Sequence, residues 1–210
     1  KFNPYAHVRK ELTVDDVLNS APLAWPIKLL DVPPISDGAA AVVLCPEELV
    51  GESTTTPAFI RGIAYCAEAD NAPQRSMLMS EPLAHAARVV YRASGITNPR
   101  RQLDVVEVQE PFSCFELSYY ETLGLCRAGE AAELIASGAT QMTGDIPVNP
   151  SGGCLGANPI GAAGLIRLIE ATMQVTGKAG DHQIAGARLA AAQTGGGWAN
   201  LRGVAVVSSD

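Results

Sequence analysis

The alternation of two hydrophobic periodicities constrains the fold of this 210-residue chain more than any other feature. Short apolar runs that predict buried strands lie at 58–66, 104–108, 186–194 and 203–209. Apolar residues at helical spacing, with glycine near several ends, predict helices at 81–95, 111–125, 129–138 and 161–177. Strands that alternate with helices indicate an α/β fold with a largely parallel sheet. The last two strands are close enough for a hairpin, which predicts a mixed sheet.

The N-terminal quarter has a different pattern. Residues 1–35 contain five prolines and predict an irregular excursion rather than a sheet element. The turn signal at 36–38 precedes the apolar run 39–45, which predicts another buried strand. The polar stretch 51–57 then indicates a connection between two structural halves.

Composition and charge narrow the class of protein. Hydrophobic residues make up 47% of the chain and charged residues 18%, which excludes intrinsic disorder. The net charge of −7, with no cluster of Lys and Arg, gives no reason to expect nucleic acid as a partner. An anionic ligand would therefore need a local pocket. No apolar run reaches the roughly 18 residues of a membrane span.

The five cysteines form an odd set without a CxxC pair. This argues against a disulfide framework or a metal site such as zinc, and fits a reducing cytoplasm. The N-terminus has no signal-peptide pattern and begins with Lys1, as expected of a cytoplasmic protein that lacks an upstream portion.

Three segments have the position and composition of ligand-binding loops. Residues 108–112 follow a predicted strand, 149–164 are rich in glycine and open into a helix, and 193–197 lie between the last two strands. In open α/β sheets, ligands bind beyond the carboxyl ends of the strands. We therefore expect these three loops to converge on one cavity.

The order and spacing of these loops resemble the thiolase superfamily, in particular its sterol-carrier-protein-type (SCP-x-like) branch. Gln109 to Phe112 match the family's Asn-Glu-Ala-Phe or His-Asp-x-Phe motif. Residues 152–162 match its Gly-His-Pro loop, one residue shorter and with Ala157 in place of the glycine before His. The segments 147–153, 176–188 and the terminal glycine loop also match, and 36–44 resembles the closing strand of the family's N-terminal half.

The resemblance implies a layered αβαβα fold built from two similar halves. Residues 1–56 would then form the end of the N-terminal half and its loop region, and residues 57–210 the C-terminal half. It also implies an acyl-CoA substrate, coenzyme A as substrate or product, no permanently bound cofactor, and a homodimer core. The family's nucleophilic cysteine lies before the region that this chain matches.

Several departures from the family pattern bear on the chemistry. Asn158 stands where the family has His: an amide can donate a hydrogen bond to an enolate oxygen, but it cannot accept a proton near neutral pH. Its plainer interpretation is a turn residue before Pro159. Gln109 replaces Asn or His and would position a water or the thioester oxygen. Glu110 would support it, act as a buried base, or stabilise a helix dipole.

The remaining candidates are a cysteine, a tyrosine and several glycines. The family's Cys-x-Gly cysteine is missing from 193–197, so Cys154 is either a substitute acid/base or a packing residue. Of Tyr119 and Tyr120, one packs and Tyr120 is our candidate for contact with substrate. The glycines that would let backbone amides approach a thioester oxygen are Gly152, Gly153, Gly156, Gly161, Gly195 and Gly196.

The resemblance, together with these departures from it, implies three alternative functions. The first is thiolysis or acyl transfer on a 3-oxoacyl-CoA. The second is retro-aldol cleavage of a 3-hydroxyacyl-CoA, such as a steroid side-chain CoA ester, with a zinc-ribbon/OB-fold partner of the DUF35 type. The third is a non-catalytic scaffold subunit.

Overall fold

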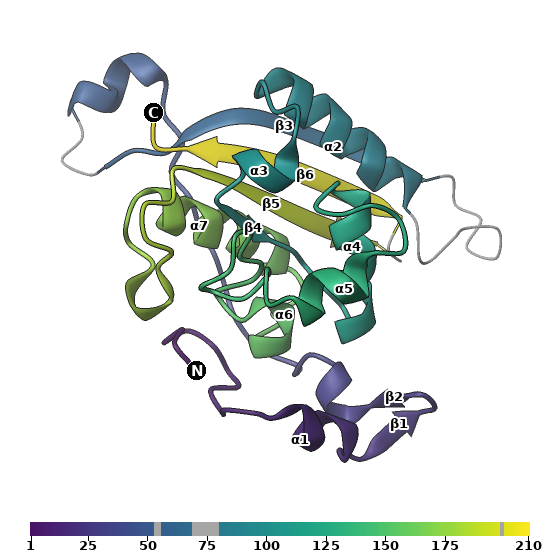
Figure 1. Cartoon of the computed structure of the whole chain (residues 1–210). Coiled ribbons are helices and arrows are strands. Elements are labelled where there is room, and N and C mark those ends of the chain that lie inside the picture. The colour runs from purple at the N-terminus through teal and green to yellow at the C-terminus, as the bar shows by residue number, and fades with distance from the viewer. Residues whose placement is uncertain (53–55, 69–79, 198–199) are drawn as a thin grey trace.

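A computed structural model describes residues 1–52, 56–68, 80–197 and 200–210. Its main sheet has the strand order β3-β6-β5-β4 (Figure 1). The strands are β3 (Phe59–Ala67), β4 (Val105–Glu107), β5 (Leu189–Gly196) and β6 (Leu201–Ser208). β6 pairs antiparallel with both β3 and β5, whereas β5 and β4 run parallel. The mixed sheet is confirmed, but its parallel part is smaller than the sequence predicted.

Helices cover both faces of this sheet, which gives three of the expected layers (Figure 1). One face carries α2 (Glu81–Ala93) and α4 (Ser113–Thr122), and the other carries α7 (Ala163–Val175). The shorter helices are α3 (Pro99–Gln102), α5 (Ala131–Ala136) and α6 (Gly153–Gly156). The Ser80 side chain caps α2 by accepting a hydrogen bond from the Leu83 amide, so the predicted helix begins where its sequence signals place it.

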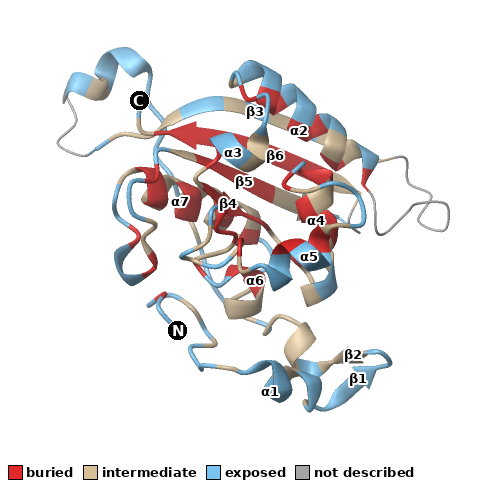
Figure 2. Cartoon of the chain, in the orientation of Figure 1, coloured by how far each residue is buried: buried red, intermediate tan, exposed pale blue. Residues whose placement is uncertain are grey.

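Two hydrophobic cores lie on the two faces of the sheet, and Figure 2 shows the buried strands between them. The core under α2 and α4 is filled by large side chains such as Leu83 and Leu123. The core under α7 contains Ala190 and Ala192 on the strand, and such small side chains let a helix approach a sheet closely. Because this helix lies so near β5, its N-terminal loop reaches the end of that strand.

The N-terminal segment contains a small hairpin that the sequence did not predict. Its elements are α1 (Val14–Leu18), β1 (Pro22–Ala24), β2 (Ile27–Lys28) and the 3-10 helices Leu29–Asp31 and Glu47–Glu52. The expectation of no sheet element was wrong. Prolines are compatible with this hairpin because Pro22 begins one strand and Pro26 lies in the turn, where a missing N–H costs little.

The predicted strand at 39–45 is also wrong. This segment has no regular structure, and the side chains of Val43 and Leu44 are 96% and 72% exposed. An apolar run indicates that a segment is suited to burial, but no strand of the described residues pairs with this one.

The N-terminal segment contacts the rest of the chain at the glycine-rich loop. The Asn3 side chain donates to the Ser151 carbonyl at 3.0 Å, and the Val8 amide donates to the Gly156 carbonyl at 2.8 Å. The main sheet and its helices lie within residues 59–208. The division at residues 56 and 57 stays a prediction.

Candidate active site

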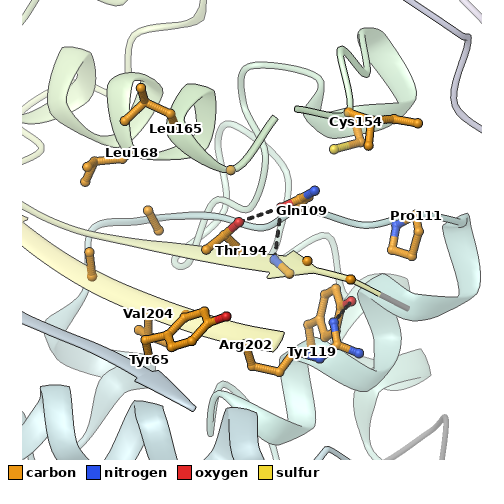
Figure 3. Close-up of a pocket in the computed structure, with 18 of the residues that line it drawn as sticks. Tyr65, Gln109, Pro111, Tyr119, Cys154, Leu165, Leu168, Thr194, Arg202 and Val204 are labelled. Carbon is orange, nitrogen blue, oxygen red and sulfur yellow. Dashed lines mark hydrogen bonds between the residues drawn. The ribbon is translucent and has the colours of Figure 1, made fainter. Parts of the chain in front are cut away.

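A cavity of about 770 Å³ opens at the carboxyl end of β5 (Figure 3). The three predicted loops meet there: Gln109 follows β4, Asn158 precedes α7, and Gly195 lies near the end of β5. Cys154 and Gly196 line the same cavity. The convergence on which the sequence interpretation depended is therefore present.

The side chain of Gln109 is held in one orientation (Figure 3). Its Oε1 accepts hydrogen bonds from the Thr194 hydroxyl at 2.6 Å and from the Gly195 amide at 2.9 Å. Its backbone amide donates to Gln193 Oε1 at 3.0 Å. Since both acceptor contacts are at Oε1, the Nε2 group is left as a donor for a ligand in the cavity.

Four of the six glycines that we expected to cradle a thioester oxygen have amides bound within the protein, whereas Gly161 and Gly196 line the cavity. The Gly195 amide is used by Gln109, and the amides of Gly152, Gly153 and Gly156 donate to Asn149 O, Ser151 Oγ and Gly152 O. These three glycines are not among the residues that line the cavity. The loop closes on itself because a buried N–H needs a partner, so these four amides are not free to bind a ligand.

Glu110 braces the glycine-rich loop and does not line the cavity. Its carboxylate accepts hydrogen bonds from Asn149 Nδ2 at 2.8 Å and from the Leu155 amide at 3.0 Å. A Cβ on Gly153 would lie 2.2 Å from Glu110 Oε1, so the close approach requires glycine. Burial, helped by the charge of Glu116, raises the pKa of Glu110 to about 8. This geometry fits a support role better than that of a base in contact with substrate.

A buried ion pair fixes the start of the same loop. Arg167 Nη1 lies 2.7 Å from Glu107 Oε2 and donates to Ser151 Oγ at 2.7 Å. The Ser151 hydroxyl in turn donates to Glu107 at 2.6 Å. Glu107 is on β4 and Arg167 on α7, so the pair joins the strand, the helix and the loop.

Cys154 faces the cavity as a neutral thiol. Burial and the nearby Glu110 carboxylate raise the pKa of Cys154 to about 12. A thiol with this pKa stays protonated at neutral pH, so it is a poor nucleophile and could act only as a proton donor.

Of the two neighbouring tyrosines, Tyr119 lines the cavity, whereas Tyr120 is absent from its lining. The Tyr120 hydroxyl donates to Glu116 Oε1 at 2.6 Å, and burial raises its pKa. The Tyr119 hydroxyl instead accepts a hydrogen bond from Arg202 Nη1 at 3.0 Å. The sequence interpretation also did not name Thr194 or Arg202 as site residues. Thr194 lies within the predicted segment 193–197, whereas Arg202 precedes the predicted strand 203–209 and in the structure belongs to β6.

Part of the cavity lining is apolar. It consists of Leu165 and Leu168 of α7, Ala205 of β6, and Ile63 and Tyr65 of β3. Such a lining beside a few oriented donors is the usual composition of a small-molecule site.

The described residues contain no group of three or more His, Cys, Asp or Glu side chains placed to hold a metal ion. Within the same residues, no helix has the length and apolar character needed to cross a membrane.

The layered α/β fold and the donor-lined cavity at its strand ends are those of a thiolase-like protein. The family model "Thiolase C-terminal domain-like" matches residues 64–209, and the chain therefore belongs to the thiolase family.

Comparison with known proteins gives relatives of several kinds. The chain is 36% identical to the acetyl-CoA acetyltransferase of Methanothermobacter thermautotrophicus, over 98% of this chain and 54% of the relative. It is 34% identical to sterol carrier protein 2 of Oryctolagus cuniculus, over 98% and 38% of the two chains. It is 32% identical to benzoylsuccinyl-CoA thiolase subunit BbsB of Thauera aromatica, over 87% and 47%. The chain thus spans about half or less of the length of these relatives.

Among solved structures, an Ltp2-ChsH2(DUF35) aldolase superposes with a TM-score of 0.83 at 24% identity, over 99% of this chain and 54% of that one. At this identity the likeness shows the fold alone.

Proposed function

We propose that this chain is the C-terminal half of an enzyme that acts on acyl-CoA thioesters and makes or breaks the carbon–carbon bond next to the thioester carbonyl. The observation that carries the proposal is the Gln109 side chain, whose Oε1 is bound by Thr194 and Gly195 so that Nε2 is left for a ligand. Asn158 lines the same cavity and carries a second amide donor.

In the thiolytic reaction, a cysteine thiolate outside this chain attacks the 3-oxo carbon of a 3-oxoacyl-CoA. The bond between C2 and C3 breaks, and its electron pair forms an enolate whose negative charge lies on the thioester oxygen. Donors aimed at that oxygen stabilise the charge as it develops. Protonation at C2 releases the CoA thioester that carries C1 and C2, and coenzyme A then takes the shortened acyl group from the cysteine as the second acyl-CoA. Coenzyme A is thus a substrate, and the proposal includes no permanently bound cofactor.

Retro-aldol cleavage of a 3-hydroxyacyl-CoA is the second candidate, because Asn158 stands where the family has His and residues 193–197 lack the family's Cys-x-Gly cysteine. This reaction needs the same enolate donors and a base that takes the proton of the 3-hydroxyl, but no acyl-enzyme. The aldolase whose structure resembles this chain carries a DUF35 partner in its name, so we propose a partner of that type, together with a homodimer core.

The two reactions are separated by their products and by mass. The complete protein is incubated with a 3-oxoacyl-CoA, with and without coenzyme A, and with a 3-hydroxyacyl-CoA. A covalent acyl adduct and coenzyme A-dependent cleavage identify thiolysis, whereas release of a carbonyl product from the hydroxy substrate without an adduct identifies retro-aldol cleavage. If the protein turns over neither substrate, the proposed enzymatic function is refuted and the non-catalytic scaffold remains as the function.

The role of Gln109 is tested by Gln109→Ala, which removes the oriented donor. Loss of one such donor lowers kcat by about a hundredfold or more. The exposed Gln141 provides the matched control, and Gln141→Ala should leave kcat unchanged. Equal rates for the two variants would contradict the proposed role.

A further inference from the structure

Arg202 is a buried cation that has no anionic partner among the residues that the structure describes. It lies at the start of β6 opposite Gly195, is 5% exposed, and lines the cavity. None of the ion pairs in the described part of the chain includes it. Its Nε is buried and has no hydrogen-bond partner there.

The contacts of the guanidinium are with Tyr119, on α4. Nη1 donates to the Tyr119 hydroxyl at 3.0 Å, and the guanidinium carbon lies 5.6 Å from the centre of the ring. A guanidinium has five N–H donors, and a phenol with its ring face satisfies only part of them. Since burial of an unpaired charge is costly, this arrangement favours an anion that binds Arg202 from the cavity.

The strand opposite leaves space for the guanidinium. A Cβ on Gly195 would lie 2.9 Å from Arg202 Nη1, so the absent side chain is what lets the cation lie beside the strand. In Figure 3, Arg202 and Tyr119 lie on the side of the β5–β6 hairpin away from Gln109. Gly195 links the two sides, because its amide donates to Gln109 while its register partner is Arg202.

We infer that Arg202, held by Tyr119, binds a carboxylate on the acyl group of the CoA thioester. The inference rests on the proposed function and names its substrate class, acyl-CoA thioesters that carry a second acidic group. The planar, two-oxygen shape of a carboxylate matches the guanidinium fork. A phosphate of coenzyme A offers similar chemistry, but the pantetheine arm separates the phosphates from the thioester, whereas Arg202 lies only one strand from the Gln109 donor.

The test is isothermal titration calorimetry on the complete protein with succinyl-CoA, butyryl-CoA and free coenzyme A. The two acyl groups have the same number of carbons and differ by a carboxylate in place of a methyl. The wild-type protein should bind succinyl-CoA about tenfold or more tightly than butyryl-CoA, as expected for a charge-assisted hydrogen bond. Arg202→Met should abolish this preference and Arg202→Lys should keep part of it. The matched control is Arg61→Met, at an exposed position on β3, which should not change it.

The comparison of ligands on the wild-type protein needs no variant, so the inference can be tested even if Arg202→Met misfolds. Equal affinity of the wild type for the two acyl thioesters overturns the inference and leaves the proposed function standing. Equal weakening of all three ligands by Arg202→Met assigns the cation to a coenzyme A phosphate and also overturns it. Failure of the wild type to bind any of the three overturns the proposed function itself.

Discussion

Replacement of Glu107 by Gln tests whether the pair that joins β4 to α7 is ionic. Glu107 and Arg167 are 0% and 3% exposed, and their charged groups lie 2.7 Å apart. Glu107→Gln keeps the shape but removes the one carboxylate that pairs directly with the buried Arg167 guanidinium, leaving only the more distant charges of Glu110 and Glu170. Loss of one partner from such a pair costs about 3–5 kcal/mol, because the other charge stays buried and uncompensated.

The assay is urea denaturation of the complete protein, with the free energy of unfolding compared between wild type and variant. Glu130→Gln is the matched control, because Glu130 lies 3.9 Å from Arg127 in a largely exposed pair. An exposed pair of this kind contributes about 0–1 kcal/mol. The difference between the two variants should therefore be about 2 kcal/mol or more.

The result that would refute this reasoning is a loss below about 1 kcal/mol for Glu107→Gln. Burial raises the pKa of Glu107 by more than the charge of Arg167 and the hydrogen bonds from Ser151 lower it. A small loss would mean that the pKa is raised far enough for Glu107 to be protonated in the native protein. A double variant, Glu107→Gln with Arg167→Met, should recover part of the loss if the pair is ionic.

Two further predictions concern the glycine-rich loop and a buried histidine. Gly153→Ala adds a Cβ to a residue whose φ is +59° and places that atom 2.2 Å from Glu110 Oε1. This variant should lower the free energy of unfolding by about 2 kcal/mol or more. Gly161→Ala is the control, because open space surrounds Gly161, and it should change the free energy of unfolding little. The hydrogen bond and charge of Glu170 raise the pKa of His182, although burial acts in the opposite direction. The pair of His182 with Glu170 therefore stabilises the folded protein fully below the unfolded-state pKa of the histidine, and this stabilisation is lost as the pH rises through the folded-state pKa. His182→Gln should therefore destabilise more at about pH 5.5 than at about pH 9 in urea titrations, and an equal loss at both would contradict the assignment.

The secondary structure of the C-terminal part was predictable because the spacing of apolar residues within each segment indicates which of its faces is buried. Apolar residues at helical spacing placed α2 and α7 to within a few residues. The same logic failed at 39–45, whose apolar run indicates burial without naming the surface that provides it. The spacing of apolar residues indicates that an element is suited to burial, but it does not identify the element that packs against it.

The candidate site was predictable at the level of loops but not of side chains. Sequence placed Gln109, Asn158 and Gly195 around one cavity, since strand ends and helix starts meet at the same edge of a sheet. It did not distinguish the role of Gln109 from that of Glu110. These two residues are consecutive in the chain, but only Gln109 lines the cavity. Which side chain enters a cavity depends on backbone direction at one residue, and a motif alone does not fix it.

The hydrogen bonds of Gln109 fix which end of its side-chain amide is free to meet a ligand in the cavity. Because the Gly195 backbone amide can only donate, rotation of the Gln109 amide by half a turn would set two donors against each other and break that hydrogen bond. A ligand atom that meets this side chain must therefore offer a lone pair and not a proton. Any hydroxyl that has to be deprotonated during the reaction must find its acceptor elsewhere, which separates charge stabilisation and proton removal onto different groups.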